Sequence, residues 1–145
     1  MPSYVTFRLG DALYGIEVLQ VQEILAEQEL TRVPLGPPEV AGLINLRGQV
    51  VTAVDVRTRV GLPPRPEGAP STDVVVRCGE EVVALVVDAI GEVVAVGDDG
   101  LEAPPDTLTG PMAELITGAH QLPGQLLLTL DVARVLALPS VPAGV

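Results

Sequence analysis

Short runs of valine, isoleucine and leucine, broken by glycine, proline or aspartate, dominate the chain. Runs of about four to eight residues that are rich in β-branched side chains predict strands rather than helices. The predicted strands span residues 4–9, 12–17, 30–33, 43–46, 49–54, 73–78, 81–87, 92–96, 115–121 and 125–130. Two turns between them, Gly10-Asp11 and Gly79-Glu80, place glycine where a tight hairpin needs a positive φ. The pattern indicates a mostly β protein, with many short strands as in small barrels.

Helices are predicted to be few and short. Two of them, over residues 56–60 and 132–138, follow Asp55 and Asp131, whose carboxylates can accept hydrogen bonds from the first free backbone N–H groups. Residues 18–25 are predicted to form a third short helix after the second strand. The four prolines within residues 62–71 predict an exposed connector; a polyproline ligand for another module is the alternative interpretation.

The two halves of the chain resemble each other. Shifted by 69 residues, the first strands align; after a slip of seven residues, the later strands and the capped helices align as well. Matched pairs include Val5 with Val74, Arg8 with Arg77, Gly10 with Gly79, Glu23 with Glu92, Gly42 with Gly118, Gly48 with Gly124, and Asp55 with Asp131. Each copy is expected to form a barrel of about five strands, with a groove between the two. Within one domain over 1–145, this gives a first lobe over 4–63, a Pro-rich connector over 64–72 and a second lobe over 73–139, and an exchange of strands between the lobes is an open alternative.

The copies differ at the tip of one hairpin. Asn45 and Arg47 in the first copy correspond to Gln121 and Pro123 in the second, while the flanking glycines stay the same. Backbone geometry explains the shared glycines but not the pair Asn45 and Arg47, so this tip is the candidate recognition surface. Alternatively, Arg47 forms a surface ion pair with Glu23, and the two roles are compatible.

The charge and the apolar content of the chain argue against nucleic-acid binding and against membrane insertion. The chain has 19 acidic and 8 basic residues, a net charge of −11, and every base is arginine. Without a clustered cationic face, nucleic acid is not an expected partner. The longest fully apolar run, over residues 82–87, is too short for membrane insertion, and the first residues lack a signal segment, so a cytoplasmic location is expected. Cys78 is the single cysteine and is expected to be an inert, small apolar residue.

Groups for catalysis are scarce. His120, the single histidine, lies in an apolar strand and is expected to serve packing, and no His, Cys and Asp cluster has metal-ligand spacing. No glycine-rich phosphate loop is present, and three aromatic residues give no stacking platform. The sequence therefore predicts no enzyme, no cofactor and no metal. An aliphatic groove with an arginine at its rim suits an amphipathic helix; a small-molecule-binding barrel or a small enzyme is the alternative from another class.

Four strings of the sequence resemble motifs of one family, the CheW-like chemotaxis coupling domain. They are Gly-Leu-Ile-Asn-Leu-Arg-Gly-Gln-Val-Val over 42–51, Val-Asp-Val-Arg over 54–57, Val-Gln-Glu-Ile over 21–24 and Leu-Val-Val-Asp over 85–88. The resemblance covers nearly the whole chain. It implies two intertwined five-stranded src-homology-3-like barrels with a few short helices and no catalysis.

The resemblance also implies partners. The protein would bridge the cytoplasmic tip of a chemoreceptor to the regulatory domain of a histidine kinase, or serve a non-flagellar chemosensory pathway such as pilus motility. The receptor's helical hairpin would lie in the groove between the lobes. The implied partner-binding residues are Val18, Val21, Glu23, Ile24, Gly42, Leu43, Asn45, Arg47 and Gly48.

Overall fold

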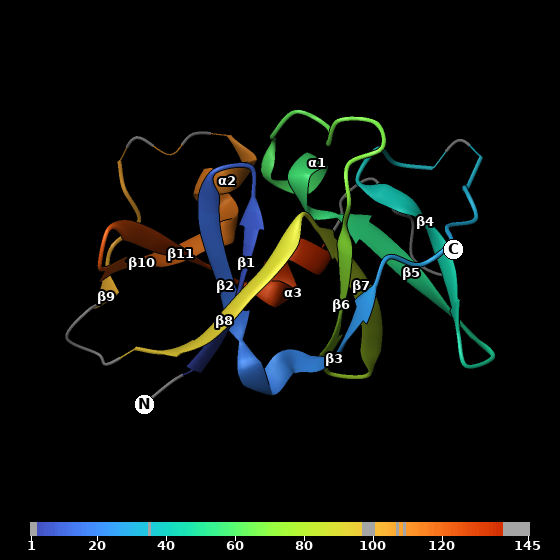
Figure 1. Ribbon diagram of the computed structural model, residues 1–145, viewed down its shortest axis with the longest axis horizontal. Helices are drawn as coiled ribbons and strands as arrows, with labels where there is room; N and C mark the ends of the chain where they lie inside the picture. The colour runs from blue at the N-terminus through green and yellow to red at the C-terminus, as the bar shows by residue number, and fades with distance from the viewer. Residues whose placement is uncertain (1–2, 35, 97–100, 107, 109, 138–145) are drawn as a thin grey trace.

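The computed structural model describes residues 3–34, 36–96, 101–106, 108 and 110–137. Figure 1 shows two β-sheets side by side, with short helices between and beside them. The strands are β1 (Ser3–Leu9), β2 (Ala12–Glu17), β3 (Val21–Ala26), β4 (Val40–Leu46), β5 (Gln49–Asp55), β6 (Thr72–Cys78), β7 (Glu81–Val87), β8 (Ala89–Ala95), β9 (Leu101–Glu102), β10 (Ile116–Leu122) and β11 (Gln125–Leu130). The helices are the 3-10 turn η1 (Val18–Gln20), α1 (Val56–Val60), α2 (Pro111–Leu115) and α3 (Val132–Leu136).

Both sheets mix strands from the two halves of the sequence. One sheet has the order β8-β1-β2-β11-β10-β9, and the other has the order β3-β6-β7-β5-β4. In each sheet a hairpin from one half pairs in parallel with a strand from the other half, β2 with β11 and β5 with β7. The two halves are therefore interlocked, and the mostly β fold predicted from the sequence is confirmed.

The sheets are open rather than closed barrels. The ladder that starts at β3 ends at β4 and does not return to β3 among the described strands. Instead, the segment after β3 approaches β4, where Thr31 and Leu43 exchange two backbone hydrogen bonds of 2.8 Å. This bridge brings the two edges of the sheet together at one point, so the sheet curls as a barrel does without closing its ladder.

The core lies mainly between the two sheets. One cluster of buried side chains joins the strands of both sheets and the short helices, with Phe7, Tyr14, Leu85 and Val132 at its centre. Smaller clusters fill the opposite face of each sheet, around Ile44 in one sheet and around other aliphatic side chains in the second. Because β6 and β7 are buried on both faces, they have continuous valine-rich sequences rather than a strict alternation.

The internal duplication predicted from the sequence has a structural counterpart. β1 and β2 are followed by β3 at an edge, and β6 and β7 are followed in the same way by β8 at an edge of the other sheet. Asp55 accepts a hydrogen bond from the Arg57 backbone N–H at 3.1 Å, and Asp131 accepts one from the Arg134 backbone N–H at 3.1 Å. Both aspartates are therefore helix caps, as predicted.

Several element predictions were wrong in detail. Residues 18–25 form one 3-10 turn and then β3, because pairing with β6 outweighs the helix propensity of Gln, Glu and Leu. Residues 30–33 make a single bridge at Thr31 instead of a strand. β8 begins three residues before the predicted 92–96, α2 and β9 were not predicted, and α3 ends at Leu136, with Leu138 outside the described residues.

His120 is buried in β10, as the sequence predicted, with its ring 5.6 Å from that of Tyr4. Neither imidazole nitrogen has a hydrogen-bond partner among the described residues, and burial lowers the pKa of His120 below its ordinary 6.5. More than about one pH unit above 6.5 the ring is neutral in both the folded and the unfolded chain, so it adds no pH dependence there.

Below pH 6.5 the unfolded chain takes up a proton that the folded chain resists, so the free energy of unfolding falls. One proton limits this slope to about 1.4 kcal/mol per pH unit. We expect His120→Leu to lose less stability than the wild type between about pH 7 and pH 5, measured by urea denaturation across that range. Parallel losses in the two proteins would contradict this role for His120.

Candidate functional site

The first part of the candidate site is the edge segment η1–β3. Val18 and Val21 are partly buried and pack against the central core, whereas Ile24 is 45% exposed. Among the described strands β3 pairs with β6 alone, so its other edge has no ladder partner there. The segment therefore fixes its inner valines to the core and presents an apolar side chain outward.

The second part is the turn between β4 and β5. Arg47 and Gly48 form its two central residues, with φ values of 53° and 84°, which identify a type I′ hairpin turn. Arg47 is the one residue other than glycine with a positive φ in the described part of the chain. The side-chain amide oxygen of Asn45 accepts a hydrogen bond of 2.9 Å from the Gly48 N–H and holds the turn. The left-handed backbone region disfavours arginine relative to glycine, so the turn is locally strained at Arg47.

A bidentate ion pair joins the two parts. Nη1 of Arg47 lies 2.6 Å from Oε2 of Glu23, and Nη2 lies 2.7 Å from Oε1. The hydrogen bonds lower the pKa of Glu23 and raise that of Arg47. The Arg47 side chain nevertheless remains 70% exposed. β3 and β4 are opposite edges of one sheet, so the ion pair connects these edges while leaving the guanidinium open to a partner.

Gly42 and Leu43 lie beneath the segment after β3 rather than on the surface. A Cβ atom at Gly42 would meet the Thr31 carbonyl oxygen at 2.7 Å, and the φ of Gly42 is 155°. Leu43 is half-buried and bonded to Thr31 through its backbone. Both residues therefore shape the candidate site from below, because they let the Thr31 segment approach β4.

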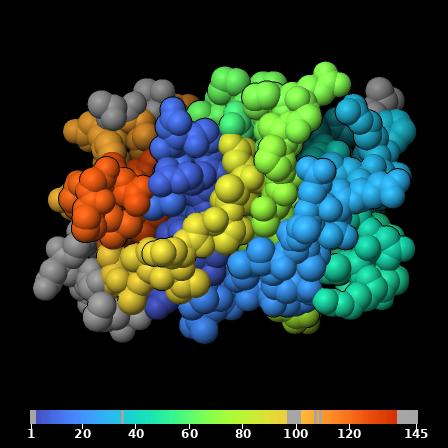
Figure 2. All heavy atoms as spheres, in the orientation of Figure 1, coloured from blue at the N-terminus to red at the C-terminus, as the bar shows by residue number. Residues whose placement is uncertain are grey.

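Sequence reasoning did not single out three exposed apolar side chains. Leu19 in η1 is 94% exposed, Val50 is 66% exposed and Val93 in β8 is 60% exposed. Val50 stands directly opposite Asn45 in the β4–β5 ladder, so its side chain shares a face with Asn45 beside the turn. Figure 2 shows β8 crossing one face of the molecule between the β1–β2 hairpin and the other sheet. Large apolar side chains this exposed are typical of protein-binding surfaces when they cluster.

A second polar centre surrounds Asp88, which the sequence marked only as part of a motif. Its carboxylate accepts hydrogen bonds from Arg57 at 2.5 and 2.8 Å, from Arg65 Nε at 3.0 Å and from the Gly10 N–H at 2.8 Å. The Arg57 contacts contribute most to lowering the pKa of Asp88 to about 2. These contacts connect the β1–β2 hairpin, α1, the connector and the end of β7. The connector is therefore anchored at Arg65.

Two features are absent from the part of the chain that the structure describes. No group of three or more His, Cys, Asp or Glu side chains is placed to hold a metal ion. None of the described helices is long and apolar enough to cross a membrane.

The fold and the exposed surface define a class of small, duplicated β proteins, in which two interlocked sheets present an edge strand and a hairpin tip to solvent. The chain belongs to the CheW-like domain family, which it matches over residues 3–140. It is similar to the "Chemotaxis protein CheW" of Treponema pallidum, with 31% identity over 90% of this chain and 79% of that protein. The protein of the same name from Klebsiella aerogenes is 28% identical over 93% of this chain and 81% of that protein.

A solved structure also shows the likeness of this chain to CheW proteins. The crystal structure of the scaffolding protein TtCheW from Thermoanaerobacter tengcongensis superposes with a TM-score of 0.85, 25% identity and 97% coverage of both chains. Members of this family are non-catalytic adaptors or scaffolds in chemotaxis. The chain is accordingly a chemotaxis adaptor or scaffold and not an enzyme.

Proposed function

We propose that this adaptor couples chemoreceptors to a histidine autokinase in the cytoplasm, within one CheW-like domain of residues 1–145. Its lobes, 4–63 and 73–139, exchange strands and are joined by the connector 64–72. The observation that carries the proposal is the Glu23–Arg47 ion pair, whose guanidinium is bonded to the edge strand and yet 70% exposed. A rigidly held, exposed arginine suits recognition of an acidic group, because little rotamer entropy is lost when the partner binds.

The receptor tip, a helical hairpin, would lie along β3 and the β4–β5 tip. Ile24 and the nearby Leu19 offer exposed apolar surface for one face of a helix. Arg47 would meet an acidic side chain at the edge of that face. Val18, Val21, Gly42, Leu43, Asn45 and Gly48 would support this surface from the core, the bridge and the turn.

The kinase regulatory domain would bind a different face. The family resemblance implies that the kinase regulatory domain has the same fold, and this domain would dock against the outer faces of the two sheets rather than against the Arg47 tip. The same contacts would serve a chemosensory pathway with another output, such as pilus motility; the genes beside the coding sequence distinguish these outputs.

The test is to mix the purified chain with a receptor tip and a kinase regulatory domain and to measure binding of each by size exclusion and co-sedimentation. We expect Arg47→Glu to weaken receptor binding about tenfold or more and to change kinase binding less than about twofold, because a charge reversal at a central contact is costly. Arg134→Glu, a charge reversal at an exposed and ion-paired arginine on α3, outside both sheets, is the matched control and should leave both intact. Equal loss of both partners by a folded Arg47→Glu protein would contradict the receptor assignment.

A further inference from the structure

The turn that carries Arg47 contains a hydrogen bond that does not belong to the β4–β5 ladder. The ladder ends at the pair Leu46 and Gln49, so the N–H of Gly48, inside the turn, has no strand partner. The side-chain oxygen Oδ1 of Asn45 accepts a hydrogen bond of 2.9 Å from this N–H. Asn45 is thereby tied to the residue that follows Arg47.

The backbone of this turn is unfavourable for an arginine. Both central residues have a positive φ, 53° at Arg47 and 84° at Gly48. Glycine adopts such angles freely, whereas arginine keeps them where its surroundings hold them. A Cβ atom at Gly48 would meet no atom within 4 Å, so the shape of the turn, and not a lack of space, accounts for the glycine. The hydrogen bond to Asn45 stabilises this shape, because it joins the two ends of the strained residue's neighbourhood.

The equivalent hairpin in the second half of the chain has a different turn. Gln121 stands there at the position of Asn45, and Pro123 stands at the position of Arg47. Proline cannot take a positive φ, and Gly124 has one of 76°, which fits a type II turn. The side-chain amide of Gln121 donates to two backbone carbonyl oxygens at 3.3 and 3.4 Å instead of accepting from the turn. The accepting side chain therefore occurs in the hairpin with the type I′ turn.

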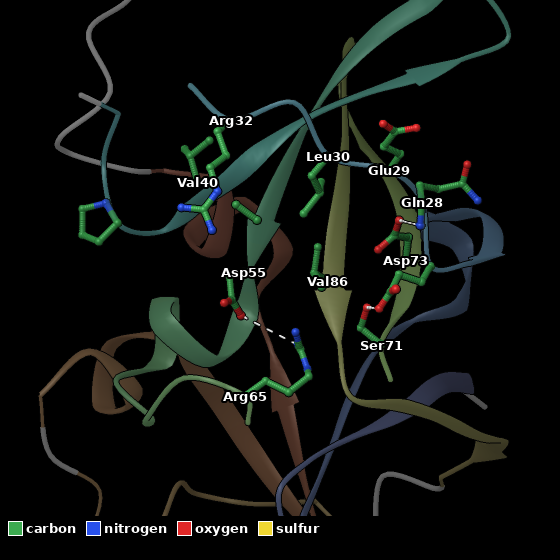
Figure 3. Close-up of a pocket in the computed structure, with 13 residues that line it drawn as sticks. Gln28, Glu29, Leu30, Arg32, Val40, Asp55, Arg65, Ser71, Asp73 and Val86 are labelled. Atoms are coloured by element: carbon green, nitrogen blue, oxygen red, sulfur yellow. Dashed lines mark hydrogen bonds and ion pairs between the residues drawn. The ribbon is translucent and has the colours of Figure 1, made fainter. Parts of the chain in front are cut away.

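The Glu23 side of the ion pair is fixed independently of the turn. Glu23 pairs with Val75 of β6, and the chain that follows β3 (Figure 3) crosses to β4, where two backbone hydrogen bonds of 2.8 Å hold Thr31. The contacts from Arg47 to Glu23, at 2.6 and 2.7 Å, use both carboxylate oxygens. A bidentate pair requires one orientation of the guanidinium, so a change of the backbone at residue 47 breaks at least one of the two contacts.

We infer that Asn45 is a positioning residue for receptor recognition, because its bond to Gly48 holds residue 47 in the left-handed conformation. The guanidinium then stays bonded to Glu23, and its exposed side stays directed toward the acidic group of the receptor. The inference rests on the proposed receptor surface at Arg47. It assigns to Asn45 a contact with the turn and none with the partner; a direct contact between Asn45 and the partner is an outcome that the test distinguishes.

The test compares Asn45→Ala, which removes the acceptor, with Asn45→Ser, whose hydroxyl oxygen keeps an uncharged one. The matched control is Gln121→Ala, at the same place in the second hairpin. Two quantities are measured on the full chain: the pKa of the Glu23 carboxyl group by ¹³C NMR, and the binding of receptor tips by co-sedimentation. Thermal unfolding of each variant checks that the fold is intact.

In Asn45→Ala the hydrogen bonds from Arg47 that lower the pKa of Glu23 should be partly lost, so this pKa should rise toward its ordinary 4.5. Receptor binding should weaken about fivefold, because Arg47 then adopts its binding conformation for a fraction of the time. Asn45→Ser should bind the receptor within about twofold of the wild type. Gln121→Ala should change neither the pKa of Glu23 nor receptor binding.

An unchanged pKa of Glu23 in a folded Asn45→Ala protein would overturn the inference, and weaker receptor binding by that protein would then indicate a direct contact of Asn45 with the partner. Equal rises of this pKa in the serine and alanine variants would overturn it as well, because the acceptor would not be what holds the turn. A raised pKa with unchanged receptor binding would leave Asn45 as the residue that positions Arg47, and would contradict the receptor assignment of Arg47 itself.

Discussion

Replacing Asp88 with asparagine is expected to lower the free energy of unfolding at pH 7 by about 3 kcal/mol. The amide cannot neutralise Arg57 and Arg65, whose side chains are only 13% and 15% exposed, so two partly buried cations lose the carboxylate that bonds both of them, and the longer Arg65–Asp55 ion pair of 4.0 Å remains. Chemical denaturation monitored by circular dichroism measures the change. Asp11→Asn, at an exposed position of the neighbouring turn, is the control and should shift stability by less than about 0.5 kcal/mol.

The difference between wild type and Asp88→Asn should depend on pH in one direction. The pKa of Asp88 is about 2 in the folded protein and 3.8 ordinarily, so its stabilising charge is fully present above about pH 4 and is lost as the pH falls toward 2. This shift in the pKa of Asp88 corresponds to about 2 kcal/mol of the free energy of unfolding. The free energies of unfolding of the wild type and of Asp88→Asn should therefore converge as the pH falls toward 2. Equal stability of the two proteins at pH 7 would show that the contacts around Asp88 do not hold the fold together.

The parts of the fold that were predictable from the sequence rest on short-range signals. A few neighbouring residues determine the length of a strand, the glycines of a hairpin and the caps at Asp55 and Asp131. Each of these patterns also occurs in both halves of the sequence, which supported the prediction. The interlocking of the two halves was not predictable in this way. It depends on parallel pairing of β5 with β7 and of β2 with β11, and no local pattern specifies which of two similar copies a strand joins.

The wrong helix at residues 18–25 shows where propensity fails. Gln22, Glu23 and Leu25 favour a helix, but the open edge of β6 gives this segment a partner, and its side chains then alternate between half-buried and exposed. The alignment of the two halves indicated a strand here, because it paired Glu23 with Glu92, which lies in a predicted strand. The Glu23–Arg47 pair was predictable as an alternative, whereas the convergence on Asp88 was not, because its partners lie 78, 31 and 23 residues before it in the sequence.

Reversing the Glu23–Arg47 ion pair should separate its two roles. Glu23→Arg alone places two guanidiniums together, and Arg47→Glu alone places two carboxylates together, so each single variant opens the link between β3 and the hairpin tip. In the double variant the charges are exchanged and the pair can form again. We expect the double variant to regain the wild-type thermal unfolding profile, because the repulsion is gone.

Receptor binding by the double variant should nevertheless stay about tenfold weaker than that of the wild type, because a carboxylate now occupies the exposed position that the Arg47 guanidinium held. Co-sedimentation with receptor tips and thermal unfolding, applied to all four proteins, measure the two effects. Full recovery of receptor binding in the double variant would mean that the pair only braces β3 against the turn, and that the partner does not read the charge at residue 47. If receptor binding stays weak while thermal stability is restored, recognition belongs to the exposed guanidinium. The ion pair between residues 23 and 47 is then present, but the contact of an arginine at residue 47 with the receptor is not.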